Sequence, residues 1–217
     1  MVCQYNFAMA SGELRSAFKT IGQSFRLWWD DWSNGVLVSL VTILASLTGL
    51  LAGPAILGMS AVADDLADGI RTGIAGWWGG FKRFFWVGLL WGVVNIIVFA
   101  LAGIALWFYT QWDTPWSPIL AIFLIVMTVI WTYVQLLVPG YLIAQEDKKL
   151  GLAWKNSLFT LLASPGFCLV SCGISFVILI LSLATILPLV IGTGPLLALV
   201  SVLTVRDRLA SYGKNEG

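Results

Sequence analysis

Long runs of apolar residues, separated by short polar segments, are the main feature of the chain. Several runs approach or exceed the roughly 20 residues that a helix needs to cross about 30 Å of hydrocarbon. None shows the alternation of apolar and polar residues that is typical of a strand in an outer-membrane barrel. We therefore expect an all-α fold, a polytopic helical membrane bundle over residues 34–208. Its predicted membrane segments are 35–51, 54–67, 83–109, 118–144, 159–184 and 187–205.

The segment before this bundle, residues 11–33, has the pattern of an amphipathic helix. Apolar residues recur at steps of three and four, while basic residues fall on other faces. The apolar set is Leu14, Phe18, Ile21, Phe25 and Trp28, and the polar set is Arg15, Lys19, Gln23 and Arg26. We predict that this helix lies in the membrane interface with its basic side toward an anionic leaflet. The alternative is a polar lead-in helix packed on the bundle. Residues 1–10, where Met9 is an alternative start, are expected to be an unstructured tail, and residues 209–217 a polar tail.

A corner between residues 53 and 85 organises the first half of the predicted bundle. Gly53 and Pro54 should end one helix, because proline lacks a backbone N–H and disfavours a helical residue before it. Proline is well tolerated at the start of the next helix, which is short for a full crossing. Three alternatives remain for residues 35–67: a hairpin, a re-entrant pair, or one kinked span. Residues 69–80 contain five glycines, which predicts a mobile turn or a broken interfacial helix.

The composition supports placement in a membrane. The 217-residue chain is 59% hydrophobic and 11% charged, against roughly 25% charged residues in soluble domains. Its formal net charge of +1 gives no reason to expect a nucleic-acid partner. The predicted partners are the lipid bilayer and other membrane protein subunits.

The distribution of Lys and Arg predicts the topology, because cytoplasmic loops carry an excess of these residues. Residues 110–117 and the neighbourhood of Pro188 contain neither. The basic residues placed inside are Arg71, Lys82, Arg83, Lys148, Lys149, Lys155, Arg206 and Arg208. We therefore predict a multi-pass plasma-membrane protein with both termini in the cytoplasm.

Three short motifs carry a resemblance to a known family. They are Gly53-Pro54-Ala55, Gly80-Phe81-Lys82-Arg83-Phe84-Phe85 and Ala153-Trp154-Lys155-Asn156-Ser157, which precedes a predicted span. With these motifs, residues 30–208 resemble the YesL-like family of small bacterial membrane proteins. The resemblance implies a multi-span protein of the bacterial cytoplasmic membrane, sometimes linked with carbohydrate import systems and without an assigned reaction. Small bacterial families with a Pro-Gly pair before an acidic turn, here Pro139-Gly140, are similar in layout.

The sequence offers little that could catalyse a reaction. It contains no histidine, so no Ser-His or Cys-His arrangement and no histidine-containing metal site can form. Cys168 and Cys172 are four residues apart, and we interpret them as small packing residues rather than metal ligands. We therefore expect no enzymatic activity, no cofactor and no metal.

The densest group of carboxylates lies at the end of the second predicted segment. Asp64 and Asp68 share a helix face with Asp65 close by, so these residues could bind a divalent cation. They could also pair with Arg71, Lys82 and Arg83, or form a solvated helix end. We treat Asp64, Asp65, Asp68, Arg71, Lys82 and Arg83 as a candidate surface charge cluster.

Two uncharged polar residues, Asn95 and Gln135, fall inside predicted spans. An amide surrounded by lipid needs a partner, so each should form an interhelical hydrogen bond or line a solute pathway. Gly88-x-x-x-Gly92 on the Asn95 helix would allow another backbone to approach closely.

The last two predicted spans contain Pro188, Gly192, Gly194 and Pro195, as the discontinuous helices of transporters do, although a simple hairpin explains the same residues. Two functional hypotheses follow from the sequence. The first is a non-enzymatic accessory or scaffold subunit of a larger membrane assembly. The alternative is a small-solute transporter or channel.

Overall fold

The computed structural model describes residues 2–112, 114–185 and 192–213, and this part of the chain is helical without any β-strand. The all-α prediction is confirmed for these residues. Pro188 lies outside them. The helices are α1 (Val2–Asp30), α2 (Trp32–Ser46), α3 (Ala52–Ala67), α4 (Gly73–Arg83), α5 (Phe85–Gln111), α6 (Ser117–Ala144), α7 (Leu150–Ala163), α8 (Pro165–Thr185) and α9 (Gly194–Gly213).

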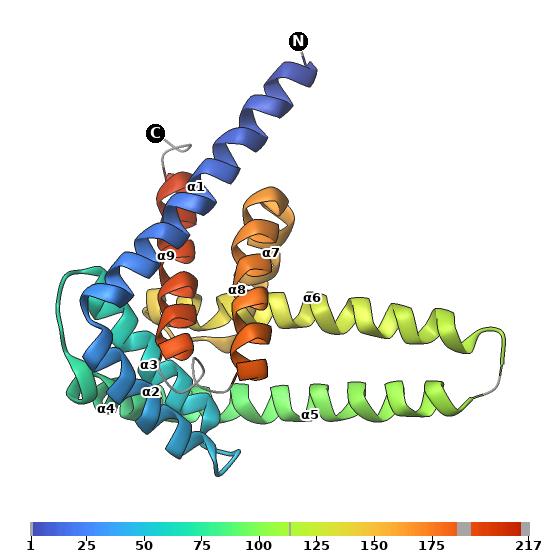
Figure 1. Ribbon diagram of the computed structural model, residues 1–217, viewed down its shortest axis with the longest axis horizontal. Helices are drawn as coiled ribbons and strands as arrows, with labels where there is room; N and C mark the ends of the chain where they lie inside the picture. Colours follow the sequence, from blue (N-terminus) through green and yellow to red (C-terminus); the bar gives the residue numbers. More distant parts are fainter. Residues whose placement is uncertain (1, 113, 186–191, 214–217) are drawn as a thin grey trace.

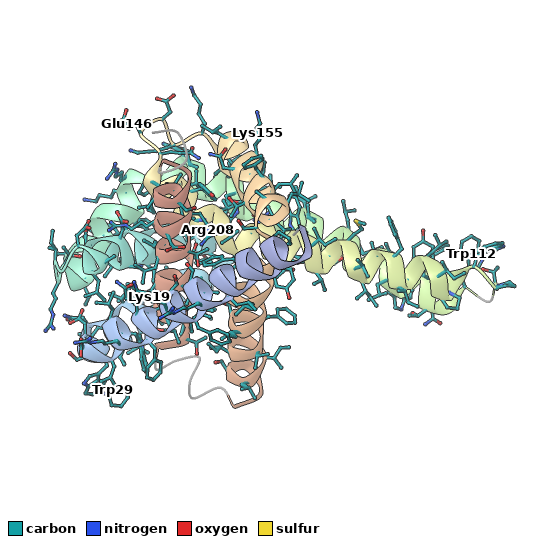
Figure 2. The ribbon with its side chains drawn as sticks, turned by 90° about the horizontal axis from the view of Figure 1, so that it is seen from above. Lys19, Trp29, Trp112, Glu146, Lys155 and Arg208 are labelled. Atoms are coloured by element: carbon teal, nitrogen blue, oxygen red, sulfur yellow. The ribbon has the colours of Figure 1, made fainter. Side chains whose placement is uncertain are left out.

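α5 and α6 lie side by side as a hairpin that projects from the other helices as a long arm (Figure 1). Trp112 lies at the far end of this arm (Figure 2). The other helices gather around the base of the arm. In both views α8 and α9 run crosswise to the arm, so they do not lie parallel to α5 and α6 as in a simple bundle of spans.

α3 is the central helix of the base. It packs against α2, α4, α5, α6 and α9, and most of its side chains between Gly53 and Ala63 are buried. Small residues allow this close packing: a Cβ on Gly58 would lie 2.8 Å from the carbonyl oxygen of Trp77 in α4. Trp77 Nε1 also donates a hydrogen bond to the carbonyl oxygen of Ala55, at 3.1 Å.

α1 packs against α8 and α9 through small residues and leaves large apolar residues exposed. Ala17, Thr20 and Ser24 are buried. Among the side chains of α1 that the structure describes, from residue 14 onward, the exposed large apolar ones are Leu14, Phe18, Phe25 and Trp29. Residues 2–10, which we expected to be an unstructured tail, continue this helix. They contain neither glycine nor proline to end it.

Two of the predicted spans are interrupted. The predicted span 83–109 begins only at Phe85, because the backbone leaves the helical conformation at Phe84, whose ring is 1% exposed. The predicted span 159–184 is divided at Ser164 between α7 and α8. Pro165 explains this break, because proline disfavours a helical conformation in the preceding residue.

The break between the first two predicted segments lies slightly earlier than expected. α2 ends at Ser46, and Gly49 adopts a left-handed conformation with φ 70° in the turn to α3. Pro54 sits in the first turn of α3, where a missing N–H costs no intrahelical hydrogen bond. Residues 35–67 therefore form two helices, which pack against each other, rather than one continuous helix. α9 extends beyond residue 205, so residues 209–213 of the expected polar tail are helical.

Candidate functional site

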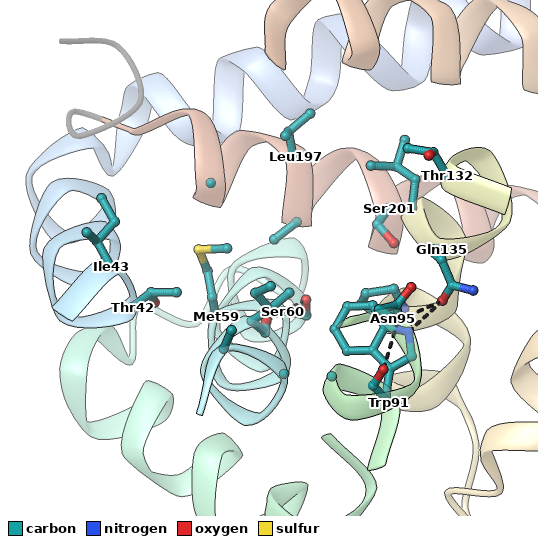
Figure 3. Close-up of a pocket in the computed structure, with 18 of the residues that line it drawn as sticks. Thr42, Ile43, Met59, Ser60, Trp91, Asn95, Thr132, Gln135, Leu197 and Ser201 are labelled. Carbon is teal, nitrogen blue, oxygen red and sulfur yellow. Dashed lines mark hydrogen bonds between the residues drawn. The ribbon is translucent and has the colours of Figure 1, made fainter. Parts of the chain in front are cut away.

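A pocket of about 780 Å³ lies between α2, α3, α5, α6 and α9 (Figure 3). None of its described lining residues is ionisable. Most of the lining is apolar, and the polar groups include Thr42, Ser60, Asn95, Gln135 and Ser201. This volume falls within the range of about 300–1,000 Å³ that is typical of small-molecule sites.

Glycines at the contact between α3 and α5 form one wall of this pocket. A Cβ on Gly53 would lie 1.9 Å from the carbonyl oxygen of Gly88, and one on Gly88 would lie 2.7 Å from the backbone of Pro54. A Cβ on Gly92 would lie 3.3 Å from the backbone nitrogen of Gly53. The close approach expected from Gly88-x-x-x-Gly92 is therefore present, and its partner is the Gly53-Pro54 stretch.

A cluster of hydrogen-bonded side chains, which we call the Gln135 cluster, lies at the α6 side of the pocket. It consists of Trp91, Asn95, Trp131, Gln135 and Trp154. Gln135 Oε1 accepts hydrogen bonds from Trp91 Nε1 at 2.6 Å, Trp154 Nε1 at 3.2 Å and Asn95 Nδ2 at 3.4 Å. Asn95 Oδ1 accepts one from Trp131 Nε1 at 3.1 Å. The two amides singled out in the sequence are thus brought together across α5 and α6.

The tryptophans of this cluster were not identified from the sequence. On α5, Trp91 precedes Asn95 by four residues, and on α6 Trp131 precedes Gln135 by four. Side chains four apart share a helix face, so this repeated spacing is a signal that could have identified two of the three tryptophans. Trp154 belongs to α7, and no local pattern connects it to the cluster.

Most hydroxyl groups of the pocket are satisfied by the protein itself. Ser60 Oγ donates to the carbonyl oxygen of Ile56 at 3.0 Å, and Ser201 Oγ accepts from the backbone N–H of Gly140 at 3.2 Å. Among the described residues that line the pocket, two buried polar side-chain atoms lack a hydrogen-bond partner: Gln135 Nε2 and Thr42 Oγ1. Gln135 is only 8% exposed. The pocket therefore presents a largely apolar surface with few free hydrogen-bonding groups.

The rim of the pocket joins the exposed surface of the arm. Ile96 and Phe99 of α5 line the pocket and are also 50% and 42% exposed. Farther along the same helix, the exposed apolar side chains continue with Leu101, Ile104, Trp107 and Phe108. A molecule in contact with the arm could reach the pocket over a continuous apolar surface.

The aspartates of the candidate charge cluster have a partner other than those expected. Arg206 in α9 bridges Asp64 and Asp68, with its Nη2 2.6 Å from Asp64 Oδ1 and its Nη1 2.5 Å from Asp68 Oδ1. Hydrogen bonding and the positive charge of the Arg206 guanidinium hold the pKa of the Asp68 carboxyl below its usual value, against a smaller desolvation effect. Asp65 accepts a hydrogen bond from Thr72 Oγ1 at 2.8 Å.

The three cations that we expected beside these aspartates have other neighbours. Arg71 Nε lies 3.8 Å from Asp31 Oδ1. Lys82 lies over the ring of Trp78, and Arg83 lies over the ring of Phe84. None of these residues lines the pocket. Among the residues that the structure describes, no three His, Cys, Asp or Glu side chains form a group that could hold a metal ion.

Within the described chain, two helices, α5 and α6, are long and apolar enough to cross a membrane by length and composition. In the most apolar 18-residue stretch of each helix, only 11% is buried against the rest of the protein. A scan against family models finds no match to this chain, and searches of curated proteins and of solved structures find no similar protein.

Proposed function

We propose that this chain is an integral membrane protein whose α5–α6 hairpin crosses the bilayer and whose pocket binds a small, uncharged, mainly apolar molecule. This function is a form of the transporter hypothesis, in which the molecule enters from the hydrocarbon rather than from water. The observation that carries it is the pocket of about 780 Å³, which has no described ionisable lining residue and opens onto the apolar surface of the arm. The proposal assigns no reaction to the chain.

The spacing of exposed tryptophans along α5 supports a crossing by the hairpin. Trp86 is 77% exposed near the base, and Trp107 is 67% exposed near the tip. At about 1.5 Å per residue they are about 32 Å apart along the helix, close to the thickness of about 30 Å of a bilayer core. Tryptophan is enriched at both membrane interfaces. The base carries Lys82, Arg83 and Lys148, whereas residues 110–117 contain no Lys or Arg, so we place the base in the cytoplasm.

In this orientation α2 and α3 form a re-entrant pair. Gly53, at the start of α3, meets α5 at Gly88 and Gly92, close to the base. About 28 Å of α5 extends beyond Gly92, at about 1.5 Å per residue. The turn between α2 and α3 therefore stays in the cytoplasmic half of the bilayer, and both helices enter and leave on the same side.

The exposed surface of α1 supports its placement in the cytoplasmic interface. The apolar Phe18, Phe25 and Trp29 and the basic Arg15, Lys19 and Arg26 are all exposed. A helix that exposes apolar residues beside basic ones suits the boundary between acyl chains and anionic headgroups.

The pocket is tested by filling it. Leu197→Trp adds volume to the lining, and Leu101→Trp makes the same change on the exposed face of the arm as the control. We expect mass spectrometry of the protein, isolated in lipid nanodiscs, to find a stoichiometric neutral small molecule in the wild type and in Leu101→Trp, but much less in Leu197→Trp. Equal recovery from both folded variants would contradict the proposal.

A second candidate function, an accessory or scaffold subunit, is favoured by the arm. Along most of their length α5 and α6 expose large apolar side chains, which lipid or a partner subunit would cover. Purification of the tagged protein from its own membranes in mild detergent would show a stoichiometric partner subunit in this case. Recovery of the protein alone would favour the pocket function.

A further inference from the structure

Two basic residues, one just before α5 and one just after α6, lie over the same aromatic ring at the base of the hairpin. Arg83 is the last residue of α4 and precedes α5 by one residue, Phe84. Lys148 lies between the end of α6 at Ala144 and the start of α7 at Leu150. Neither residue belongs to the pocket described above.

Both cations lie over one aromatic ring. Arg83 Cζ and Lys148 Nζ are each 5.2 Å from the centroid of the buried Phe84 ring. The negative face of an aromatic ring attracts cations, but it does not carry a full charge that would neutralise two of them. Lys82 adds a third positive charge next to Arg83, with its Nζ 4.9 Å from the ring of Trp78.

No carboxylate among the described residues forms an ion pair with these three cations. Asp147, in the same loop as Lys148, pairs instead with Lys149, at 2.7 Å. Asp64 and Asp68 pair with Arg206. Glu146 is exposed and forms no ion pair within the described structure. The site therefore has an excess of positive charge that a bound anion would balance.

We propose that Arg83 and Lys148, with Lys82 beside them, bind the phosphate of an anionic phospholipid headgroup. Arginine and lysine are the usual ligands of phosphate, and arginine can donate two parallel hydrogen bonds to it. Trp86, the exposed interfacial residue, follows Arg83 by three positions, so the site lies at headgroup level if the hairpin crosses the bilayer as proposed. Basic residues next to a membrane helix on the cytoplasmic side attract anionic lipids.

The test measures thermal unfolding of the full-length protein in a neutral detergent. Dioleoylphosphatidylglycerol, dioleoylphosphatidylcholine and inorganic phosphate are added separately. A ligand that binds only the folded protein raises its Tm. We expect phosphatidylglycerol to raise the Tm by several degrees more than phosphatidylcholine does. The difference should fall by at least half in both Arg83→Gln and Lys148→Gln.

Lys155→Gln is the matched control, because Lys155 is an exposed lysine on α7 and is not one of the cations found over the Phe84 ring. It should retain the full effect of phosphatidylglycerol. A Tm rise with inorganic phosphate alone, lost in Lys148→Gln, would assign the same phosphate chemistry to a soluble ligand. Equal responses in Lys148→Gln and Lys155→Gln would overturn the proposal.

Native mass spectrometry gives a second readout that does not depend on stability. The wild type should retain one more phosphatidylglycerol than Lys148→Gln does, and Lys155→Gln should match the wild type. Leu197→Trp should also match it, because the headgroup site and the pocket are separate. If the neutral molecule is found in the pocket but no phosphatidylglycerol is bound at Arg83 and Lys148, only the headgroup proposal fails. If phosphatidylglycerol binds there but no neutral molecule is found, only the pocket proposal fails.

Discussion

A single amide oxygen, Gln135 Oε1, accepts three N–H groups from α5 and α7. Removal of this acceptor would leave the indole N–H groups of Trp91 and Trp154 without their partner, whereas Asn95 Nδ2 would keep its hydrogen bond to the carbonyl oxygen of Trp91, at 2.8 Å. Gln135, which lines the pocket on α6, therefore connects α6 to both α5 and α7.

Replacing Gln135 by leucine should lower the free energy of unfolding by about 1–3 kcal/mol, the cost of leaving buried donors unpaired. The double-mutant cycle with Trp91→Phe, which removes the indole N–H and keeps an aromatic ring, should show a coupling free energy. Denaturant unfolding measures both. Gln111→Leu, at the exposed end of α5, should change stability by less than about 0.5 kcal/mol. Additive effects of Gln135→Leu and Trp91→Phe would rule out the hydrogen bond.

The pair of Asp68 and Arg206 predicts a dependence on pH. Arg206 lowers the pKa of Asp68 in the folded state, so the pair stabilises the protein above the unfolded pKa of about 4. That contribution is lost as the pH falls through the lower folded pKa. The stability difference between wild type and Arg206→Gln should therefore be largest near neutral pH and shrink below about pH 4. A stability difference between wild type and Arg206→Gln that stays constant down to pH 2 would exclude this linkage. The control is Arg26→Gln, because Arg26 pairs with Asp30 on the exposed surface.

At the residue scale, the sequence identified groups that need partners better than it identified the partners. Asn95 and Gln135 stand out because amides are rare in apolar helices. The partner of Asp64 and Asp68 could not be predicted, because Arg206 is 142 positions away from Asp64 and no local spacing joins them. Arg71, Lys82 and Arg83 were nearer in sequence, but packing of α9 on α3 decides the pairing.

At the scale of helices, glycines decide where two backbones meet. Gly88→Ala places a Cβ 2.7 Å from the backbone of Pro54, so α3 and α5 must separate. We expect a loss of about 1–3 kcal/mol, as for other overpacked sites, measured by unfolding in detergent. Gly103→Ala is the control on the same helix, because its Cβ would meet nothing within 4 Å. If both variants lose equal stability, the loss comes from α5 itself and not from its contact with α3.

The helical ends were predictable where proline or glycine marks them and less so elsewhere. Pro165 alone could have indicated the break at Ser164, although the apolar run across it favoured one span. The break at Phe84 has no such marker, because burial of its ring in the core cluster with residues of α3, α6 and α7 depends on tertiary packing. Apolar runs show which segments avoid water, but they do not show how those segments cross.

At the scale of the whole molecule, the arm and the base imply a topology that cysteine labelling can test. In a background without Cys3, Cys168 and Cys172, a membrane-impermeant maleimide added outside cells should label Thr110→Cys at the tip. Lys155→Cys should react only after the membrane is permeabilised. The turn between α2 and α3, probed by Leu47→Cys, should not react from outside if the pair is re-entrant. External labelling of Leu47→Cys would instead support the crossing hairpin of a six-segment topology.

The bridge from Arg206 to α3 also bears on how the chain is made. The ribosome adds Arg206 142 residues after Asp64, so both aspartates at the end of α3 remain without this partner during most of translation. The ribosome completes α3 early, but Asp64 and Asp68 can pair with Arg206 only after α9 has been made. The base thus depends on the last helix, and a nascent chain that stops before α9 lacks the ion pairs of Asp64 and Asp68 with Arg206.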